Sequence, residues 1–90
     1  MTTAKRYDSV WHPEAENLKI RAALMAELAA YIDQAGLTQA QAARRLGVTQ
    51  PRVSDLVRGK IDLFSIDALV NMLSAAGLHL EVTVRPAKAN

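Results

Sequence analysis

The stretch from Leu37 to Gly59, LTQAQAARRLGVTQPRVSDLVRG, constrains the fold more than any other part of the chain. It contains the start and stop signals of two short helices that only a few residues separate. Thr38 is a favourable N-cap residue. Gln41, three residues later, completes a capping box in which each side chain accepts a hydrogen bond from the other residue's backbone N–H. Gly47 readily adopts the left-handed conformation that ends a helix.

A second helix is predicted directly after the turn. Thr49 is expected to cap it, and Pro51 is tolerated in its first turn, where a backbone N–H has no helical partner. Apolar residues fall where the two helices face each other: Ala42, Ala43 and Leu46 in the first helix, Val48 in the turn, and Val53, Leu56 and Val57 in the second. Because Ala43 is small, the helices are predicted to cross closely and at a steep angle.

The outward face of the second helix is polar, with Gln50, Arg52, Ser54, Asp55 and Arg58. Amide, hydroxyl and guanidinium groups are the types that read base edges and bind phosphates.

Charge is also uneven along the chain. Residues 36–60 contain five basic residues and one acidic residue, whereas the remainder contains six basic and eight acidic residues. A positive region on a nearly neutral protein indicates nucleic-acid binding when it coincides with such a helix pair.

The spacing of Ala43, Gly47, Val53 and Leu56 resembles the helix-turn-helix signature. The chain is similar in particular to the phage-repressor-like family (lambda repressor/Cro, or XRE) over roughly residues 20–76. The following tract, GKIDLFSIDALVNML, resembles especially the small members that serve as antitoxins in toxin–antitoxin pairs (HigA-like). The resemblance implies sequence-specific binding to double-stranded DNA, with the Gln that opens the first helix contacting the DNA backbone.

Individual roles follow from this interpretation. Gln50 is the first choice for a bidentate contact to adenine, and Arg52 would read a guanine or bind a phosphate. Thr38 and Gln39 would present a helix N-terminus to a phosphate, and Pro51 would meet a thymine methyl or only stiffen the turn. The predicted DNA-binding residues are Thr38, Gln39, Thr49, Gln50, Pro51, Arg52, Ser54, Asp55, Arg58 and Lys60.

The flanking segments complete the predicted organisation. Residues 1–13 form a flexible N-terminal segment, residues 14–77 the DNA-binding domain, residues 78–85 a strand and residues 86–90 a tail. Within the domain, an amphipathic helix from Glu14 to about Ala35, with a stripe that includes Leu18, is expected to cover the helix pair. The connection after Gly59 should turn Ile61, Leu63 and Phe64 inward before a last helix over about residues 66–76. We therefore predict a mainly helical (all-α) fold of about four helices with one C-terminal strand.

The strand prediction rests on alternation, because Leu78, Leu80, Val82 and Val84 alternate with polar residues. A lone strand leaves its backbone groups unpaired. We expect it to pair with a second copy across a twofold axis, giving a homodimer on a palindromic operator. A toxin, or the segment around residues 7–11, is the alternative partner.

Enzymatic chemistry is not expected. His12 and His79 lie far apart without cysteine or carboxylate clusters, and no serine lies in a nucleophile motif. No metal or cofactor is predicted. Without cysteines, a signal peptide or a membrane-spanning run, a cytoplasmic protein is expected.

The favoured function is a dimeric DNA-binding repressor. The alternatives are an antitoxin that neutralises a toxin enzyme and regulates its own operon, and a non-specific DNA-associated protein.

Overall fold

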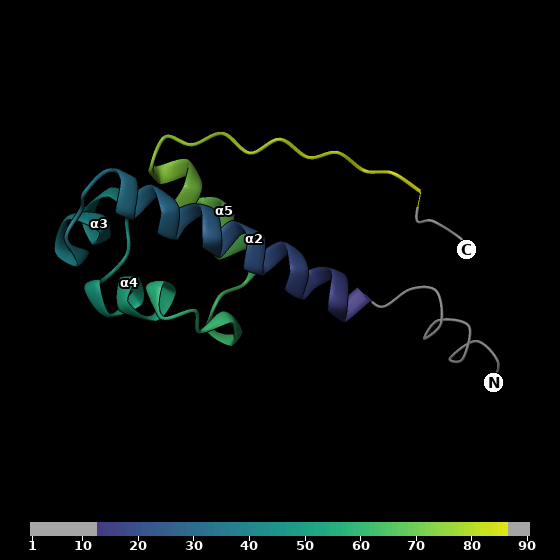
Figure 1. The fold of residues 1–90 in the computed structure, drawn as a ribbon, viewed down its shortest axis with the longest axis horizontal. Helices are drawn as coiled ribbons and strands as arrows, with labels where there is room; N and C mark the ends of the chain where they lie inside the picture. Colours follow the sequence, from purple (N-terminus) through teal and green to yellow (C-terminus); the bar gives the residue numbers. More distant parts are fainter. Residues whose placement is uncertain (1–12, 87–90) are drawn as a thin grey trace.

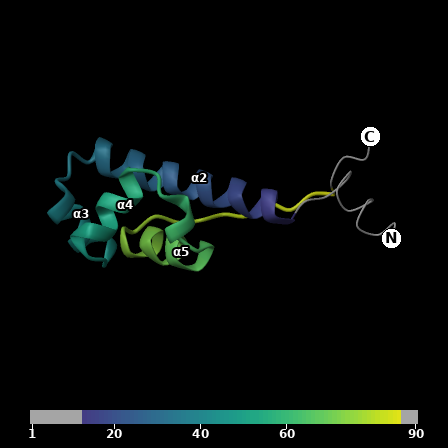
Figure 2. The ribbon, with the colours of Figure 1, turned by 90° about the horizontal axis from the view of Figure 1, so that it is seen from below.

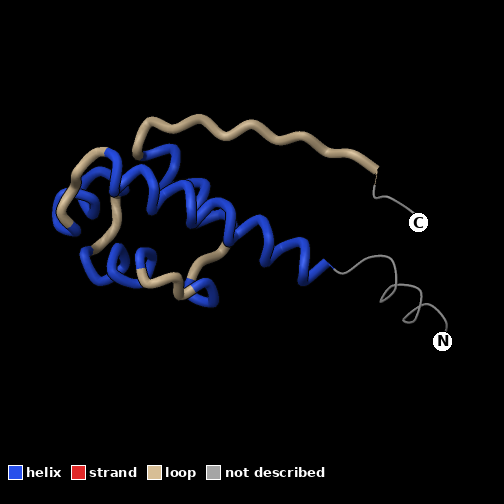
Figure 3. Tube along the Cα trace, viewed as in Figure 1, coloured by secondary structure: helices blue, strands red, loops and turns tan. Residues whose placement is uncertain are grey.

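The computed structural model describes residues 13–86, and its regular elements are all helical (Figures 1 and 3). They are α2 (Pro13–Gln34), α3 (Gln39–Leu46), α4 (Gln50–Val57), the short 3-10 helix η1 (Ile61–Leu63) and α5 (Ile66–Ala75). The mainly helical prediction is therefore confirmed. The prediction of a mobile N-terminal segment and of a role for residues 7–11 or His12 lies outside the described residues, as does most of the predicted tail.

α2 is the longest element, and the other helices gather beside its C-terminal half (Figures 1 and 2). Its first turns extend beyond the bundle. The buried residues come from every α-helix and from the connection before α5. The largest side chains with almost no exposure are Phe64, Leu28, Leu56, Leu69 and Val53. One apolar core thus holds α3 and α4 against α2 and α5.

Three apolar side chains that were predicted to lie inside are exposed, each for a local reason. Leu18 is 41% exposed and lies near the start of α2, whose first turns extend past the bundle (Figure 1). Val57 is the last residue of α4 and Leu63 the last of η1, where the chain leaves the core; they are 41% and 49% exposed. The core is therefore smaller than the apolar periodicity predicts.

The capping box of α3 is confirmed. Thr38 Oγ1 accepts a hydrogen bond from Gln41 N at 3.1 Å, and Gln41 Oε1 accepts one from Thr38 N at 2.9 Å. Gly47 ends the helix at φ 70°, a conformation that glycine adopts without strain. Both ends of α3 are thus fixed by the residues that the sequence indicated.

The predicted cap of α4 is only partly right. Thr49 occupies the N-cap position, but its side chain makes no capping hydrogen bond. Pro51 has no N–H to offer, and the N–H groups of Arg52 and Val53 donate to the Thr49 backbone carbonyl at 3.1 and 3.2 Å. The hydroxyl of Thr49 therefore finds no donor in the first turn of α4.

Because only Thr38 makes a side-chain cap, substituting alanine for threonine should lower the free energy of unfolding more at position 38 than at position 49. Thr38→Ala is expected to lower the free energy of unfolding by about 0.5–2 kcal/mol, because it removes a side-chain cap. Thr49→Ala should change it by less than about 0.5 kcal/mol, as at a surface position without a special contact. Urea denaturation of both variants measures the two values. Equal losses would show that Thr49 caps α4 in solution.

The predicted strand is not formed in this single chain. Residues 78–86 carry no regular secondary structure and run as an extended chain away from the end of α5 (Figure 3). Leu78 and Leu80 are 37% and 38% exposed, while Val82 and Val84 are 75% and 87% exposed. A strand is defined by hydrogen bonds to a neighbouring strand, and residues 13–86 offer no second extended segment to pair with. Residues 78–86 therefore have the alternating sequence of a strand, but they form no ladder of backbone hydrogen bonds with a neighbouring strand.

Candidate nucleic-acid interface

α3 and α4 form a packed helix pair joined by the turn at Gly47. Ala42 and Val53 are fully buried between the elements, and Ala43 is 8% exposed. The N–H of Val48 donates to Ala43 O at 3.0 Å, which holds the turn against the end of α3. The pair is thus a rigid support for whatever side chains α4 presents outward.

The predicted DNA-binding residues differ in their exposure. Arg52, Ser54 and Asp55 are half-buried, whereas the other seven are exposed: Thr38, Gln39, Thr49, Gln50, Pro51, Arg58 and Lys60. The exposed set includes both helix starts and the residues that follow α4. The structure therefore leaves most of the predicted contact residues accessible on the α3–α4 unit.

The start of α3 offers backbone donors as well as side chains. The capping box uses the N–H groups of Thr38 and Gln41. The N–H groups of Gln39 and Ala40 lie in the first turn, where no helical carbonyl precedes them. Together with the positive end of the helix dipole, they suit a phosphate oxygen. At the start of α4 only Gln50 has a comparable N–H, because Pro51 has none.

Lys60 and Asp55 interact with each other after the end of α4. Lys60 Nζ lies 3.6 Å from Asp55 Oδ1, and the Lys60 backbone N–H donates to Asp55 O at 3.1 Å. An exposed ion pair of this kind contributes little to stability. It does hold the lysine ammonium close to the C-terminal end of α4.

Arg52 makes two contacts inside the chain. Its Nη1 donates to Leu63 O at 2.7 Å, and its guanidinium carbon lies 4.1 Å from the centre of the Phe64 ring. Neither the hydrogen bond to Leu63 O nor the contact with the Phe64 ring was predicted from the sequence. Every residue has a backbone carbonyl, so nothing in the sequence marks the one at position 63 as the acceptor.

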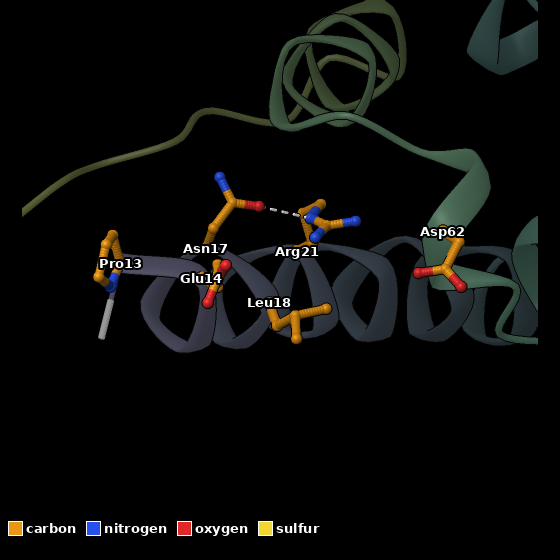
Figure 4. A pocket seen from close by; sticks show the side chains of 6 residues that line it. All are labelled: Pro13, Glu14, Asn17, Leu18, Arg21 and Asp62. Atoms are coloured by element: carbon orange, nitrogen blue, oxygen red, sulfur yellow. Dashed lines mark hydrogen bonds between the residues drawn. The ribbon is translucent and has the colours of Figure 1, made fainter. Parts of the chain in front are cut away.

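A second arginine, outside the predicted set, also binds the connection between α4 and α5. Arg21 on α2 donates from Nη1 to Ile61 O at 3.0 Å and from Nε to Asn17 Oδ1 at 2.6 Å. It borders an open surface hollow beside the first turns of α2 (Figure 4), which is lined by Pro13, Glu14, Asn17, Leu18, Arg21 and Asp62. The hollow is shallow and mixed in polarity, and the sequence indicated no ligand for it.

Further basic side chains lie on α3. Arg44 and Arg45 border another surface hollow together with Leu37 and Gln41. Arg45 donates from Nη1 to the Tyr31 hydroxyl at 2.9 Å, which ties the end of α3 to α2. These arginines belong to the positive region that the charge distribution revealed.

Among residues 13–86, no group of three or more histidine, cysteine or carboxylate side chains comes together as metal ligands would. None of the helices described here combines the length and apolar character needed to cross a bilayer.

The fold and the exposed polar face of α4 define a helix-turn-helix domain. The family described as a helix-turn-helix domain matches residues 7–85 of this chain. A solved structure named as an XRE family transcriptional regulator is 40% identical in sequence and superposes with a TM-score of 0.76, covering 82% of this chain and 83% of that one. No curated protein sequence gives a significant match. The chain therefore belongs to the XRE-like helix-turn-helix family, which confirms the resemblance drawn from Ala43, Gly47, Val53 and Leu56.

Proposed function

We propose that this protein is a sequence-specific regulator of transcription that binds double-stranded DNA as a dimer and acts as a repressor in the cytoplasm. The observation that carries the proposal is the exposed polar start of α4 on a rigidly packed helix pair. Family membership and the name of the similar structure support a DNA-binding regulator.

In the proposed complex, α4 is the recognition helix and enters the major groove. Gln50 and Ser54 are four residues apart on α4 and so lie on one face, where an amide and a hydroxyl can contact base edges. Thr38, Gln39 and the first N–H groups of α3 bind one phosphate, while Arg58 and Lys60 bind the backbone beyond the other end of α4. Pro51 meets a thymine methyl, and Thr49, whose hydroxyl makes no capping bond, is free to donate to a phosphate.

The direct test is selection of bound sequences from a random pool of DNA duplexes with the full-length protein. We expect a palindromic motif with half-sites one helical turn apart, about 10 base pairs. A selected motif without twofold symmetry would contradict the dimer, and enrichment of no motif would contradict sequence-specific binding.

Gln50→Ala and Arg58→Ala form a matched pair of variants, since both residues are exposed on the same unit. Gln50→Ala should weaken binding to the selected operator by about 1–3 kcal/mol and change binding to random DNA far less, because a base contact is lost. Arg58→Ala should weaken binding to all sequences alike and reduce the slope of log K against log salt by about one, as one lost phosphate contact does. Titrations at several salt concentrations measure both. Equal losses on both DNAs for Gln50→Ala would exclude it as a base-reading residue.

A second candidate function is that of an antitoxin which binds a toxin enzyme and regulates its own operon. The exposed apolar side chains of Val82 and Val84, which lie outside the helical bundle, favour a protein partner for this segment. If a neighbouring gene encodes a ribonuclease-like protein, co-expression of the two proteins tests it. Copurification and loss of the toxin's activity would support the antitoxin function.

A further inference from the structure

We propose that Arg52 is a positioning residue, which sets the angle of α4 against the rest of the domain and does not itself contact DNA. The proposal rests on the proposed function, because it assigns a role in operator recognition. It changes the role predicted from the sequence, in which Arg52 reads a guanine or binds a phosphate.

The position of Arg52 on the helix separates it from the DNA-facing residues. Successive residues of an α-helix are about 100° apart, so Arg52 lies about 160° around the helix from Gln50 and, on its other side, about 160° from Ser54. It is closest in direction to Leu56, which is 2% exposed and part of the core. Arg52 therefore lies on one flank of α4 beside the core, on the side away from Gln50 and Ser54, which lie only about 40° from each other.

A hydrogen bond and a cation–π contact hold the Arg52 guanidinium against the connection after α4. The 2.7 Å hydrogen bond to Leu63 O is short, as charge-assisted bonds are. The Phe64 ring beneath the guanidinium is 1% exposed and so fixed in the core. A bidentate contact to guanine would need the plane of N–H donors to turn toward the groove. That movement would break the hydrogen bond and uncover the ring.

Arg21 gives the same connection a second attachment. Its Nη1 donates to Ile61 O, so the first and third carbonyls of η1 each accept from an arginine, one on α2 and the other on α4. Asn17 holds the Arg21 side chain through Nε. The connection after α4 is thus fixed between two helices, and Arg52 is the attachment on the side of α4. Because Gln50 and Ser54 are carried by α4, its angle decides whether both reach their bases together.

The test compares Arg52→Ala with wild type by selection from the random DNA pool and by salt titration, well below the melting temperature of both proteins. We expect the ratio of operator affinity to random-DNA affinity to be about tenfold lower for Arg52→Ala than for wild type. The lost preference should be shared among the base pairs that Gln50 and Ser54 read. The salt slope should be unchanged. A loss confined to one base pair outside those read by Gln50 and Ser54 would show that Arg52 reads a base, and a slope reduced by about one would show a phosphate contact. Either result overturns the proposal.

Two further variants keep the proposal testable if Arg52→Ala does not fold. Arg52→Lys keeps the charge but loses the planar fork, so a positioning role predicts a loss of about tenfold in discrimination over the base pairs read by Gln50 and Ser54, whereas a phosphate contact predicts near wild-type binding. Phe64→Leu leaves the DNA-facing side chains intact and should reproduce the specificity profile of Arg52→Lys. The effects of Arg52→Lys and Phe64→Leu on specificity should not add in the double variant. A wild-type protein that selects no motif would overturn the proposed function and this inference together, whereas additive effects would overturn the inference alone.

Discussion

Ending the chain after Gly77 is expected to lower affinity for a two-half-site operator by about 10²–10⁴-fold, because each domain must then bind its half-site independently. The helical domain itself should stay folded, since the removed residues that the structure describes are all exposed and none belongs to the core. In the proposed dimer, two copies of residues 78–85 pair antiparallel and satisfy one edge of each strand. The pairing also sets the distance between the two copies of α4, which should be near the ~34 Å of one DNA turn.

Point substitutions distinguish the effect of losing strand pairing from the effect of removing the residues after Gly77. Neighbouring N–H groups of an extended strand point to opposite edges, so Val82→Pro and Thr83→Pro each remove a donor from a different edge. At least one of them should reproduce the truncation, while Val82→Thr, which keeps the strand propensity, should not. Sedimentation equilibrium gives the mass, and titration with operator DNA gives the affinity. A full-length protein that stays monomeric at high micromolar concentration would exclude the dimer through this segment.

Ala43→Leu is expected to lower the free energy of unfolding by about 1–3 kcal/mol, because three added carbon atoms have to fit into a closed core. Ala43 is 8% exposed, its neighbour Ala42 is fully buried, and the carbonyl of Ala43 accepts from the turn that leads to α4. A larger side chain should force α3 away from its neighbours or strain that turn. For a domain of this size the melting temperature should fall by about 4–8 °C for each kcal/mol.

Ala30→Leu is the matched control for this prediction, because it makes the same change at an exposed position in the C-terminal half of α2. Thermal unfolding followed by circular dichroism compares the two variants. A melting temperature of Ala43→Leu equal to that of Ala30→Leu would mean that the helices leave room beside Ala43.

The sequence predicts well those features that depend on neighbouring residues. The capping box at Thr38 and the helix end at Gly47 involve residues at most four positions apart, and both are present as predicted. The faces of α3 and α4 are likewise local, since helical periodicity determines which residues share a side. Local chemistry therefore predicted the helix pair, although Val57, which was predicted to face inward, is exposed and Arg52 is half-buried.

Features that depend on distant parts of the fold were not predictable in the same way. Periodicity shows that Leu18 shares a stripe with buried residues, but it does not show that α2 extends beyond its neighbours. The Thr49 hydroxyl lacks a donor because of the particular path of the chain through Pro51. The Arg52 and Arg21 contacts end on backbone carbonyls, which no residue type marks.

The extended segment after α5 has a consequence for how such a regulator would respond to its own abundance. If two copies of this segment pair as proposed, the concentration of dimer follows the square of the free monomer concentration, so halving the monomer lowers the dimer about fourfold. Operator occupancy would then change more steeply than the amount of protein in the cell. A segment that residues 13–77 leave unpaired would then be the part of the molecule that converts gene dosage into a sharp transcriptional response.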